Sequence, residues 1–142
     1  MLRSTDAGDK GSPAIPSAPP TIALIEDDDA VRRSMQLLLQ GQGFLVRSFA
    51  DAGPLLGGGE IAADCLVSDY RLRGSDGVAV LAALRAKGWR GPAIMVTAFG
   101  DGEVAQRALA AGFVEILDKP LRNRALTDAV SRALAGAGRA GG

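Results

Sequence analysis

The sequence contains no histidine and a single cysteine, and both scarcities limit the chemistry that it can support. Without histidine the chain offers no imidazole metal ligand, no imidazole general base and no nucleophile activated by one. Cys65 on its own can form neither a disulfide framework nor a cysteine-based metal site within the chain, and its place in an apolar run indicates a small core residue. Carboxylates, hydroxyls, lysine and backbone groups therefore remain as candidates, and we expect a reducing, cytoplasmic setting.

The chain also has a net charge of zero and contains no long apolar run. The 16 lysines and arginines balance 16 acidic residues, so the chain as a whole has no electrostatic attraction to nucleic acid or to an anionic membrane. No run approaches the roughly 20 apolar residues that a membrane-spanning helix requires. We therefore expect no direct binding to nucleic acid and no insertion into a membrane.

The two ends of the chain differ in composition from its middle. Residues 1–20 contain several prolines among Gly, Ser and Ala and lack the apolar centre of a secretory signal, which predicts a disordered leader. Residues 136–142 are rich in Gly and Ala and predict a flexible tail. Residues 21–135 between them are enough for one domain.

Short apolar runs alternate with helical patterns through this domain. Strands are expected at 21–25, at 44–49, in the run that ends at Asp69, at 92–96 and at 113–117. Helices are expected at 30–40, at 51–56, from Val78 to a stop at Gly88, at 103–111 and at 122–135. Such alternation predicts an α/β fold, a doubly wound five-stranded parallel sheet of order 2-1-3-4-5 with its ligand crevice at the carboxyl ends of the strands.

Polar groups of complementary chemistry follow four of these strands. Glu26 and Asp27 follow the first strand, Asp69 the third, Thr97 the fourth and Lys119 the fifth. Three carboxylates in one crevice repel one another unless a cation joins them, and hard oxygen ligands match Mg²⁺ or Mn²⁺. A metal, a hydroxyl and a lysine around an aspartate nucleophile predict phosphoryl transfer to Asp69.

Each of these groups also has a structural explanation when it is taken alone. Asp28 or Asp29 would cap the helix that follows, and the acids before them would be favoured by its dipole. Thr97 could form a turn, and Lys119-Pro120 could simply end a strand and start a helix. The convergence of all these loops at one end of the sheet favours the functional interpretation.

From about Thr21 to Ala135, the sequence resembles the receiver domain of bacterial two-component response regulators, especially those that pair with LuxR-type output domains. The matching segments are Ile25-Glu26-Asp27-Asp28, Val67-Ser68-Asp69-Tyr70-Arg71-Leu72 with Gly74, Asp76 and Gly77, Met95-Val96-Thr97-Ala98, and Asp118-Lys119-Pro120. The resemblance implies a flavodoxin-like (βα)5 receiver fold.

The resemblance also implies roles for individual residues. Asp69 would accept a phosphoryl group from a phosphohistidine on a sensor histidine kinase or a phosphotransfer protein. Asp27 and Asp69 would bind Mg²⁺ directly, the main-chain carbonyl of Arg71 would be a further ligand, and Glu26 would act through water. Mn²⁺ would serve in place of Mg²⁺.

The remaining implied roles concern the phosphoryl group and the output. Thr97, the main chain of Ala98 and Lys119 would contact the phosphoryl group, and the Lys119-Pro120 peptide would be cis. An unidentified downstream protein would bind the surface formed by the helix at 103–111, the strand at 113–117 and the last helix.

Departures from the family pattern affect the switch more than the chemistry. Ile116 stands where the family often has an aromatic residue, three before the lysine, so Ile116 cannot work as the usual aromatic switch. Phe99, two residues after Thr97, would take over part of that role or cover the site. Arg73 replaces a proline that commonly precedes the glycine of the phosphoacceptor loop.

Two alternatives stay open beside a non-enzymatic phosphoacceptor. A phosphatase of the haloacid-dehalogenase kind would want a second acid two residues after its nucleophile, where this sequence has Arg71. A pseudo-receiver, an interaction module that is not phosphorylated, usually lacks Asp69, Asp27 or Lys119, and all are present. The chain would be either a single-domain receiver or the receiver of a longer protein.

Overall fold

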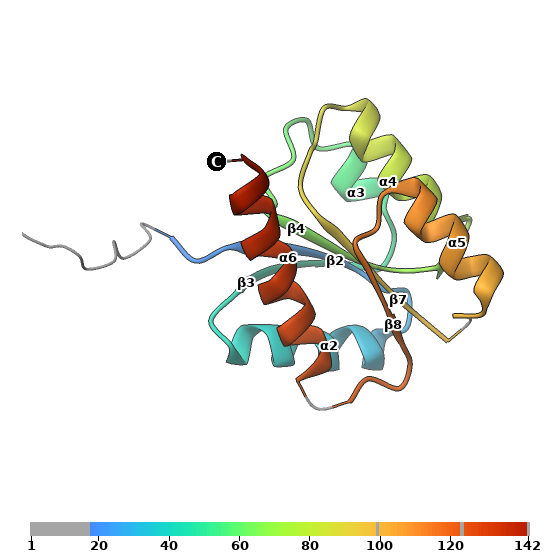
Figure 1. Ribbon diagram of the computed structural model, residues 1–142, viewed down its shortest axis with the longest axis horizontal. Helices are drawn as coiled ribbons and strands as arrows, with labels where there is room; N and C mark the ends of the chain where they lie inside the picture. Colours follow the sequence, from blue (N-terminus) through green and yellow to red (C-terminus); the bar gives the residue numbers. More distant parts are fainter. Residues whose placement is uncertain (1–17, 99, 123, 142) are drawn as a thin grey trace, which may run out of the picture.

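Five parallel strands form one sheet at the centre of the computed structural model, which describes residues 18–98, 100–122 and 124–141. The strands are β2 (Thr21–Ile25), β3 (Leu45–Phe49), β4 (Cys65–Asp69), β7 (Ala93–Thr97) and β8 (Glu115–Asp118). Their order across the sheet is β3-β2-β4-β7-β8 (Figure 1). Counted along the chain within this sheet, the order is 2-1-3-4-5, and the predicted α/β fold is confirmed.

Helices cover both faces of the sheet. They are α2 (Asp29–Gly41), α3 (Gly53–Leu56), α4 (Gly77–Ala86), α5 (Gly102–Ala111) and α6 (Ala125–Gly141). Figure 1 shows α2 and α6 on one side of the sheet and α3, α4 and α5 on the other. No helix among the described residues combines the length and the apolar character that crossing a membrane demands.

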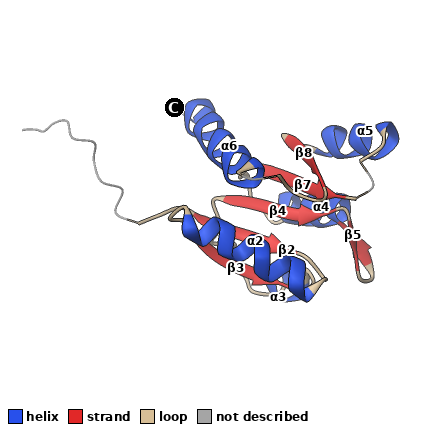
Figure 2. Cartoon of the chain, turned by 90° about the horizontal axis from the view of Figure 1, so that it is seen from below, coloured by secondary structure: helices blue, strands red, loops and turns tan. Residues whose placement is uncertain are grey.

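The two faces bury separate hydrophobic clusters. On one face, Met35 and Leu39 of α2 and Leu126 and Val130 of α6 pack against the sheet. On the other face, the core contains the following side chains from α3, α4 and α5: Leu55, Val80, Leu81, Leu84 and Ala108. The central strands β4 and β7 are buried at every position because helices cover them on both sides. Figure 2, turned by 90°, shows the carboxyl ends of these strands directed toward one edge of the molecule.

Aspartate side chains start three of the helices close to that edge. Asp28 accepts a hydrogen bond from the Val31 N–H at 3.0 Å and thereby caps α2, as predicted. Asp76 caps α4 and Asp101 caps α5 in the same way, with acceptor distances of 2.8 Å and 3.0 Å. Each cap satisfies an N–H group that has no partner within its helix.

The loop after Asp69 contains a small hairpin that the sequence analysis did not predict. β5 (Arg71–Leu72) pairs antiparallel with β6 (Ser75–Asp76), and Gly74 takes a positive φ of 75° between them. Strands of two residues are too short to show an alternating pattern, so periodicity could not reveal them.

The last strand begins later than expected because the Phe113 N–H is bonded to the end of α5. Gly112 adopts a left-handed conformation with φ of 113°, and the Phe113 N–H donates to the Ala108 carbonyl at 3.0 Å. β8 therefore covers Glu115–Asp118 rather than 113–117.

The last helix extends further than the predicted range of 122–135. α6 begins at Ala125 and continues to Gly141, so residues 136–141 of the expected flexible tail are helical, while residue 142 lies outside the described residues. Alanine is the strongest helix former, and alternating alanines with no proline keep the backbone helical although each glycine costs about 1 kcal/mol.

The expected leader at the other end falls mostly outside the description, since residues 1–17 are not described. Its last residue is hydrogen-bonded to the sheet, because the Pro20 carbonyl accepts a hydrogen bond from the Leu45 N–H of β3 at 3.0 Å. The ordered domain therefore starts slightly before Thr21.

Candidate functional site

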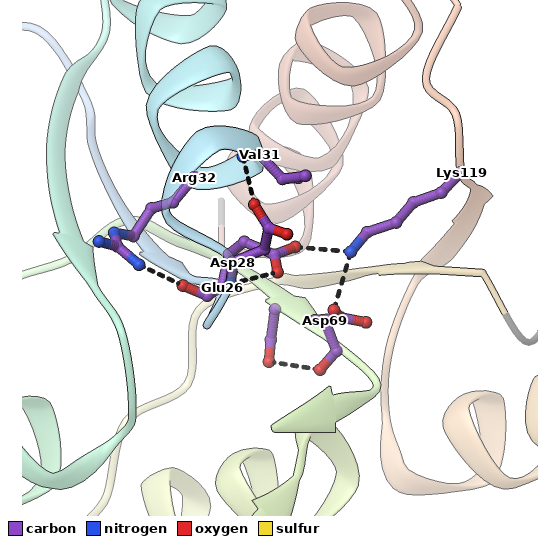
Figure 3. Close-up of polar contacts among 7 residues, drawn as sticks. Glu26, Asp28, Val31, Arg32, Asp69 and Lys119 are labelled. Carbon is purple, nitrogen blue, oxygen red and sulfur yellow. Dashed lines mark hydrogen bonds and ion pairs between the residues drawn. The ribbon is translucent and has the colours of Figure 1, made fainter. Parts of the chain in front are cut away.

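Three strands bring two carboxylates and one ammonium group together at their carboxyl ends (Figure 3). Lys119 Nζ, after β8, donates to Glu26 Oε1 at 2.7 Å and to Asp69 Oδ2 at 2.8 Å. Glu26 follows β2 and Asp69 ends β4, so residues far apart in the sequence meet in one place. The Lys119 side chain lies between the two carboxylates as a shared counter-charge.

Because Glu26, Asp69 and Lys119 are largely buried, the ionisation of each depends on the charges of the others. Glu26 is fully buried, Asp69 is 7% exposed, and the Lys119 side chain is 20% exposed. Burial raises the pKa of Glu26, and the charge of Asp69 adds to this, although hydrogen bonds from Lys119 and from the Asp28 N–H act in the opposite direction. Burial lowers the pKa of Lys119, but its bonds to Asp69 and Glu26 outweigh that effect and the pKa is raised. Lys119 therefore remains protonated at neutral pH.

Asp27 completes an acidic cluster with Glu26 and Asp69. One carboxylate oxygen from each of these residues lies within 4.8 Å of the others. Oxygen ligands that share one Mg²⁺ at about 2.1 Å lie roughly 3 to 4 Å apart, so the three oxygens are close to the spacing of a common cation site. The acidic cluster could hold a metal ion, and its hard oxygen donors suit Mg²⁺ or Mn²⁺.

The loop that carries Glu26 and Asp27 is held in place by its own neighbours. The Asp28 N–H donates to Glu26 Oε2 at 3.1 Å, and the Glu26 N–H donates to the Phe49 carbonyl at 3.1 Å. Arg32 donates to the Glu26 carbonyl at 2.8 Å and pairs with Asp29 at 2.7 Å. Asp28 and Asp29 thus have structural roles.

Thr97 and Lys119 are joined through the sheet. Thr97 is fully buried at the end of β7, and its carbonyl accepts a hydrogen bond from the Lys119 N–H at 3.0 Å. Ala98, the next residue, is exposed. The Lys119-Pro120 peptide bond is cis, the geometry that the resemblance to receivers implied.

The other predicted site residues lie around this centre. Arg71 begins β5 two residues after Asp69, and Arg73 is exposed in the turn of that hairpin. Ile116 lies in β8, partly buried against the core on the α5 side of the sheet. Phe99 lies outside the described residues.

Sequence reasoning missed several neighbours of Asp69. The direct bond between Lys119 and Glu26 was not foreseen, because the resemblance gave Glu26 only a role through water. Ser68 Oγ donates to the Asp69 carbonyl at 2.9 Å. Gly77 packs so closely that a Cβ on it would lie 2.5 Å from the same carbonyl oxygen. A glycine directly after a capping aspartate was the one sequence signal for this contact.

The comparison with known proteins agrees with this fold. A model of the response regulator receiver domain matches residues 22–131. The chain belongs to this family of receiver domains.

Individual relatives support the assignment. The chain is 34% identical over 114 residues to the transcriptional regulatory protein FixJ of Azorhizobium caulinodans, a match that covers 80% of this chain and 54% of FixJ. It is 37% identical over 120 residues to the C4-dicarboxylate transport transcriptional regulatory protein DctD of Rhizobium meliloti, covering 82% of this chain and 26% of DctD. The chain therefore spans about half the length of FixJ and about a quarter of DctD.

Solved structures of receiver domains have the same fold. A CheY-like response regulator receiver domain protein from Methanospirillum hungatei superposes with a TM-score of 0.76 at 25% identity, covering 84% of this chain and 96% of that one. The crystal structure of FixJ-N gives a TM-score of 0.75 at 29% identity, covering 82% and 94%.

Proposed function

We propose that this chain is a phosphoacceptor signalling module in which Asp69 receives a phosphoryl group from the phosphohistidine of a sensor histidine kinase or phosphotransfer protein. The observation that carries the proposal is the placement of Asp69, a nearly buried carboxylate 2.8 Å from a lysine ammonium and within an acidic cluster. Such a carboxylate can act as a nucleophile where cations balance the charge of the incoming group. A cytoplasmic setting and a signalling rather than an enzymatic role fit this function.

In the proposed transfer, a carboxylate oxygen of Asp69 attacks phosphorus, and the bond between phosphorus and the imidazole nitrogen breaks as the new P–O bond forms. The imidazole nitrogen keeps the electron pair of the broken bond. Lys119 would balance the charge of the phosphoryl oxygens, since its ammonium already contacts Asp69. Thr97 and the main chain of Ala98 would donate hydrogen bonds to the same oxygens.

Asp27 and Asp69 would hold Mg²⁺ or Mn²⁺ directly, with the Arg71 carbonyl as a further ligand and Glu26 contributing through water. When bound, the metal would neutralise charge on the phosphoryl oxygens. The fit of the acidic cluster to one cation supports this assignment. The ion pairs of Lys119 with Glu26 and Asp69 would balance part of the negative charge of the cluster when no metal is bound.

The output of the module would be a change in protein contacts. Phosphorylation would replace the single negative charge of the Asp69 carboxylate with the larger charge of a phosphoryl group, about −1.5 to −2, and would shift an existing equilibrium of the neighbouring loops. Thr97, Phe99 and Ile116 are the proposed switch positions. The surface of α5, β8 and α6 would then bind a downstream protein, and no direct contact with nucleic acid is needed.

The test is to incubate the protein with a small acyl-phosphate donor, with and without Mg²⁺, and to measure its intact mass. We expect one added phosphoryl group in the wild type with Mg²⁺ and none in Asp69→Asn. Glu60→Gln, which removes an exposed carboxylate away from the site, is the matched control and should behave as the wild type. Phosphorylation of Asp69→Asn to the wild-type extent would overturn the proposal.

A further inference from the structure

A side-chain contact joins the residue after Asp69 to helix α5. The Arg107 guanidinium donates to the Tyr70 hydroxyl oxygen at 2.5 Å, and its carbon lies 5.8 Å from the centroid of the Tyr70 ring. The hydrogen bond to the hydroxyl group is the contact that holds Arg107 to the edge of the Tyr70 ring. Because Tyr70 follows Asp69 directly, the contact links the phosphoacceptor position to a helix that lies 37 residues further along the chain.

Tyr70 is held close to the site through both its main chain and its side chain. The main-chain carbonyl of Tyr70 accepts a hydrogen bond from the Gly77 N–H at 2.8 Å. The ring is half-buried and packs against the hydrophobic core that Val104 of α5 and Ile116 of β8 also border. A shift of the main chain at Asp69 and Tyr70 is therefore transmitted to the ring and not lost in free rotation.

Helix α5 is held loosely by its own packing. All ten of its residues belong to the described chain, and only Ala108 among them is fully buried. Val104, Ala105 and Ala111 are partly buried, and apart from Val104 these are small side chains with little area to bury. A contact that an exposed side chain of α5 makes with a neighbouring element can consequently help to set where the helix lies.

We propose that Tyr70 and Arg107 form a relay that transmits the charge state of Asp69 to α5. The inference rests on the proposed function and adds to it a route of regulation. Added negative charge next to Tyr70 attracts the Arg107 guanidinium, and movement of the Tyr70 backbone carries the same side chain with it. Tyr70 and Arg107 are positioning residues and take no part in the transfer itself. Ile116 has no ring to rotate, whereas Tyr70 supplies an aromatic ring at this side of the core.

The experiment compares amide shifts in ¹H–¹⁵N NMR spectra before and after addition of BeF₃⁻ and Mg²⁺. Shifts in β4 report occupancy of the Asp69 site, and shifts in Gly102–Ala111 report the response of α5. We expect Arg107→Ala to keep the β4 shifts and to reduce the α5 shifts by about twofold or more, the size of effect that residues between two coupled sites have on the coupling. Gln106→Ala, an exposed neighbour on the same helix, is the matched control and should retain both sets of shifts.

Two conservative variants separate the relay from a merely structural role. Tyr70→Phe keeps the ring and loses the hydroxyl bond, and Arg107→Lys keeps the charge, so both should give α5 shifts between those of Arg107→Ala and the wild type. If Arg107→Ala melts α5, these two variants decide the question. Wild-type α5 shifts in Arg107→Ala or in both conservative variants would overturn the relay alone. Failure of BeF₃⁻ to perturb β4 in the wild type would overturn the proposed function and the relay with it.

Discussion

Gly77 lies against the main chain of Asp69 with no room for a side chain between them. A Cβ at Gly77 would come 2.5 Å from the Asp69 carbonyl oxygen, and also 3.1 Å from Ser68 Oγ and 3.3 Å from the Met95 methyl group. Two of these three atoms belong to β4 and one belongs to β7, so the start of α4 is packed directly on the strands that carry the site. The position of the Asp69 main chain therefore requires that residue 77 has no Cβ.

Gly77→Ala should therefore destabilise the protein by about 1–3 kcal/mol, the usual cost of forcing an extra methyl into a packed site. It should also slow phosphorylation, because relief of the clash displaces Asp69. Urea unfolding, followed through the fluorescence of the buried Trp89, measures the first effect. Gly102→Ala is the control, since Gly102 begins α5 in the same way and a Cβ there meets nothing within 4 Å. Equal effects of the two substitutions would contradict the steric argument.

Asp27→Asn should stabilise the protein in Mg²⁺-free buffer and reduce the further stabilisation that Mg²⁺ brings. The substitution removes one of three carboxylates whose oxygens lie within 4.8 Å of one another, and with it both repulsion and a ligand. Thermal unfolding at several Mg²⁺ concentrations measures both the stability without Mg²⁺ and the gain on adding it. Glu60→Gln, which also removes one carboxylate, is the control. A Mg²⁺ response as large as that of the wild type would show that Asp27 is not a ligand.

Lys119→Gln should lower the stability in Mg²⁺-free buffer by about 1–3 kcal/mol, because two neighbouring carboxylates lose their shared cation. Mg²⁺ should recover much of this loss, so the gain in melting temperature on adding Mg²⁺ should be larger than in the wild type. Lys87→Gln, on an exposed side chain, should change neither quantity. If Mg²⁺ stabilises Lys119→Gln less than the wild type, the lysine and the metal do not compensate for one another.

Cys65 should be chemically inert in the folded protein. Burial, with a smaller contribution from the charge of Asp64, raises the pKa of its thiol to about 12. At pH 8 only about one thiol in ten thousand would be ionised. Alkylation by iodoacetamide should therefore be much slower in buffer than in urea; equal rates would refute the assignment of Cys65 to the core.

The same raised pKa has a consequence for stability. A thiol that holds its proton more tightly in the folded state contributes stability below the unfolded pKa of about 8.5, and this contribution is lost as the pH rises toward 12. Urea unfolding at pH 7 and pH 9.5 should show a decrease in the wild type that is smaller in Cys65→Ala. An identical decrease in both proteins would mean that other groups cause it.

Much of the fold could be predicted because each buried strand leaves a clear mark on the sequence. The runs that became β2, β4 and β7 are mainly apolar and are followed by polar residues, so the strands and the residues at the carboxyl edge of the sheet could be located from them. The alternation of strands with helices then predicted the sheet order. Helix caps were also predictable, as Asp28 shows, because capping requires a particular side chain at one position.

What remained hidden depends on contacts between distant residues. The bond from Lys119 to Glu26 spans 93 positions, and nothing local to either residue specifies it. The contact of Arg107 with Tyr70 is equally invisible, since an exposed arginine on a helix is ordinary by itself. The end of α6 was misplaced for a different reason, because a segment rich in Gly and Ala was interpreted as a flexible tail although its alanines sustain the helix.

The burial of β4 and the exposure of α5 have a consequence for how the molecule opens. Every residue of β4 is buried between two helical layers, so its amide hydrogens should exchange with solvent only when the whole domain unfolds. Amides in α5, which buries Ala108 alone, should exchange through small local openings. We therefore expect slow exchange in the strand that carries Asp69 and faster exchange in the helix that would respond to it. Phosphorylation of Asp69 would then alter the rate at which α5 opens and leave the opening rate of β4 unchanged.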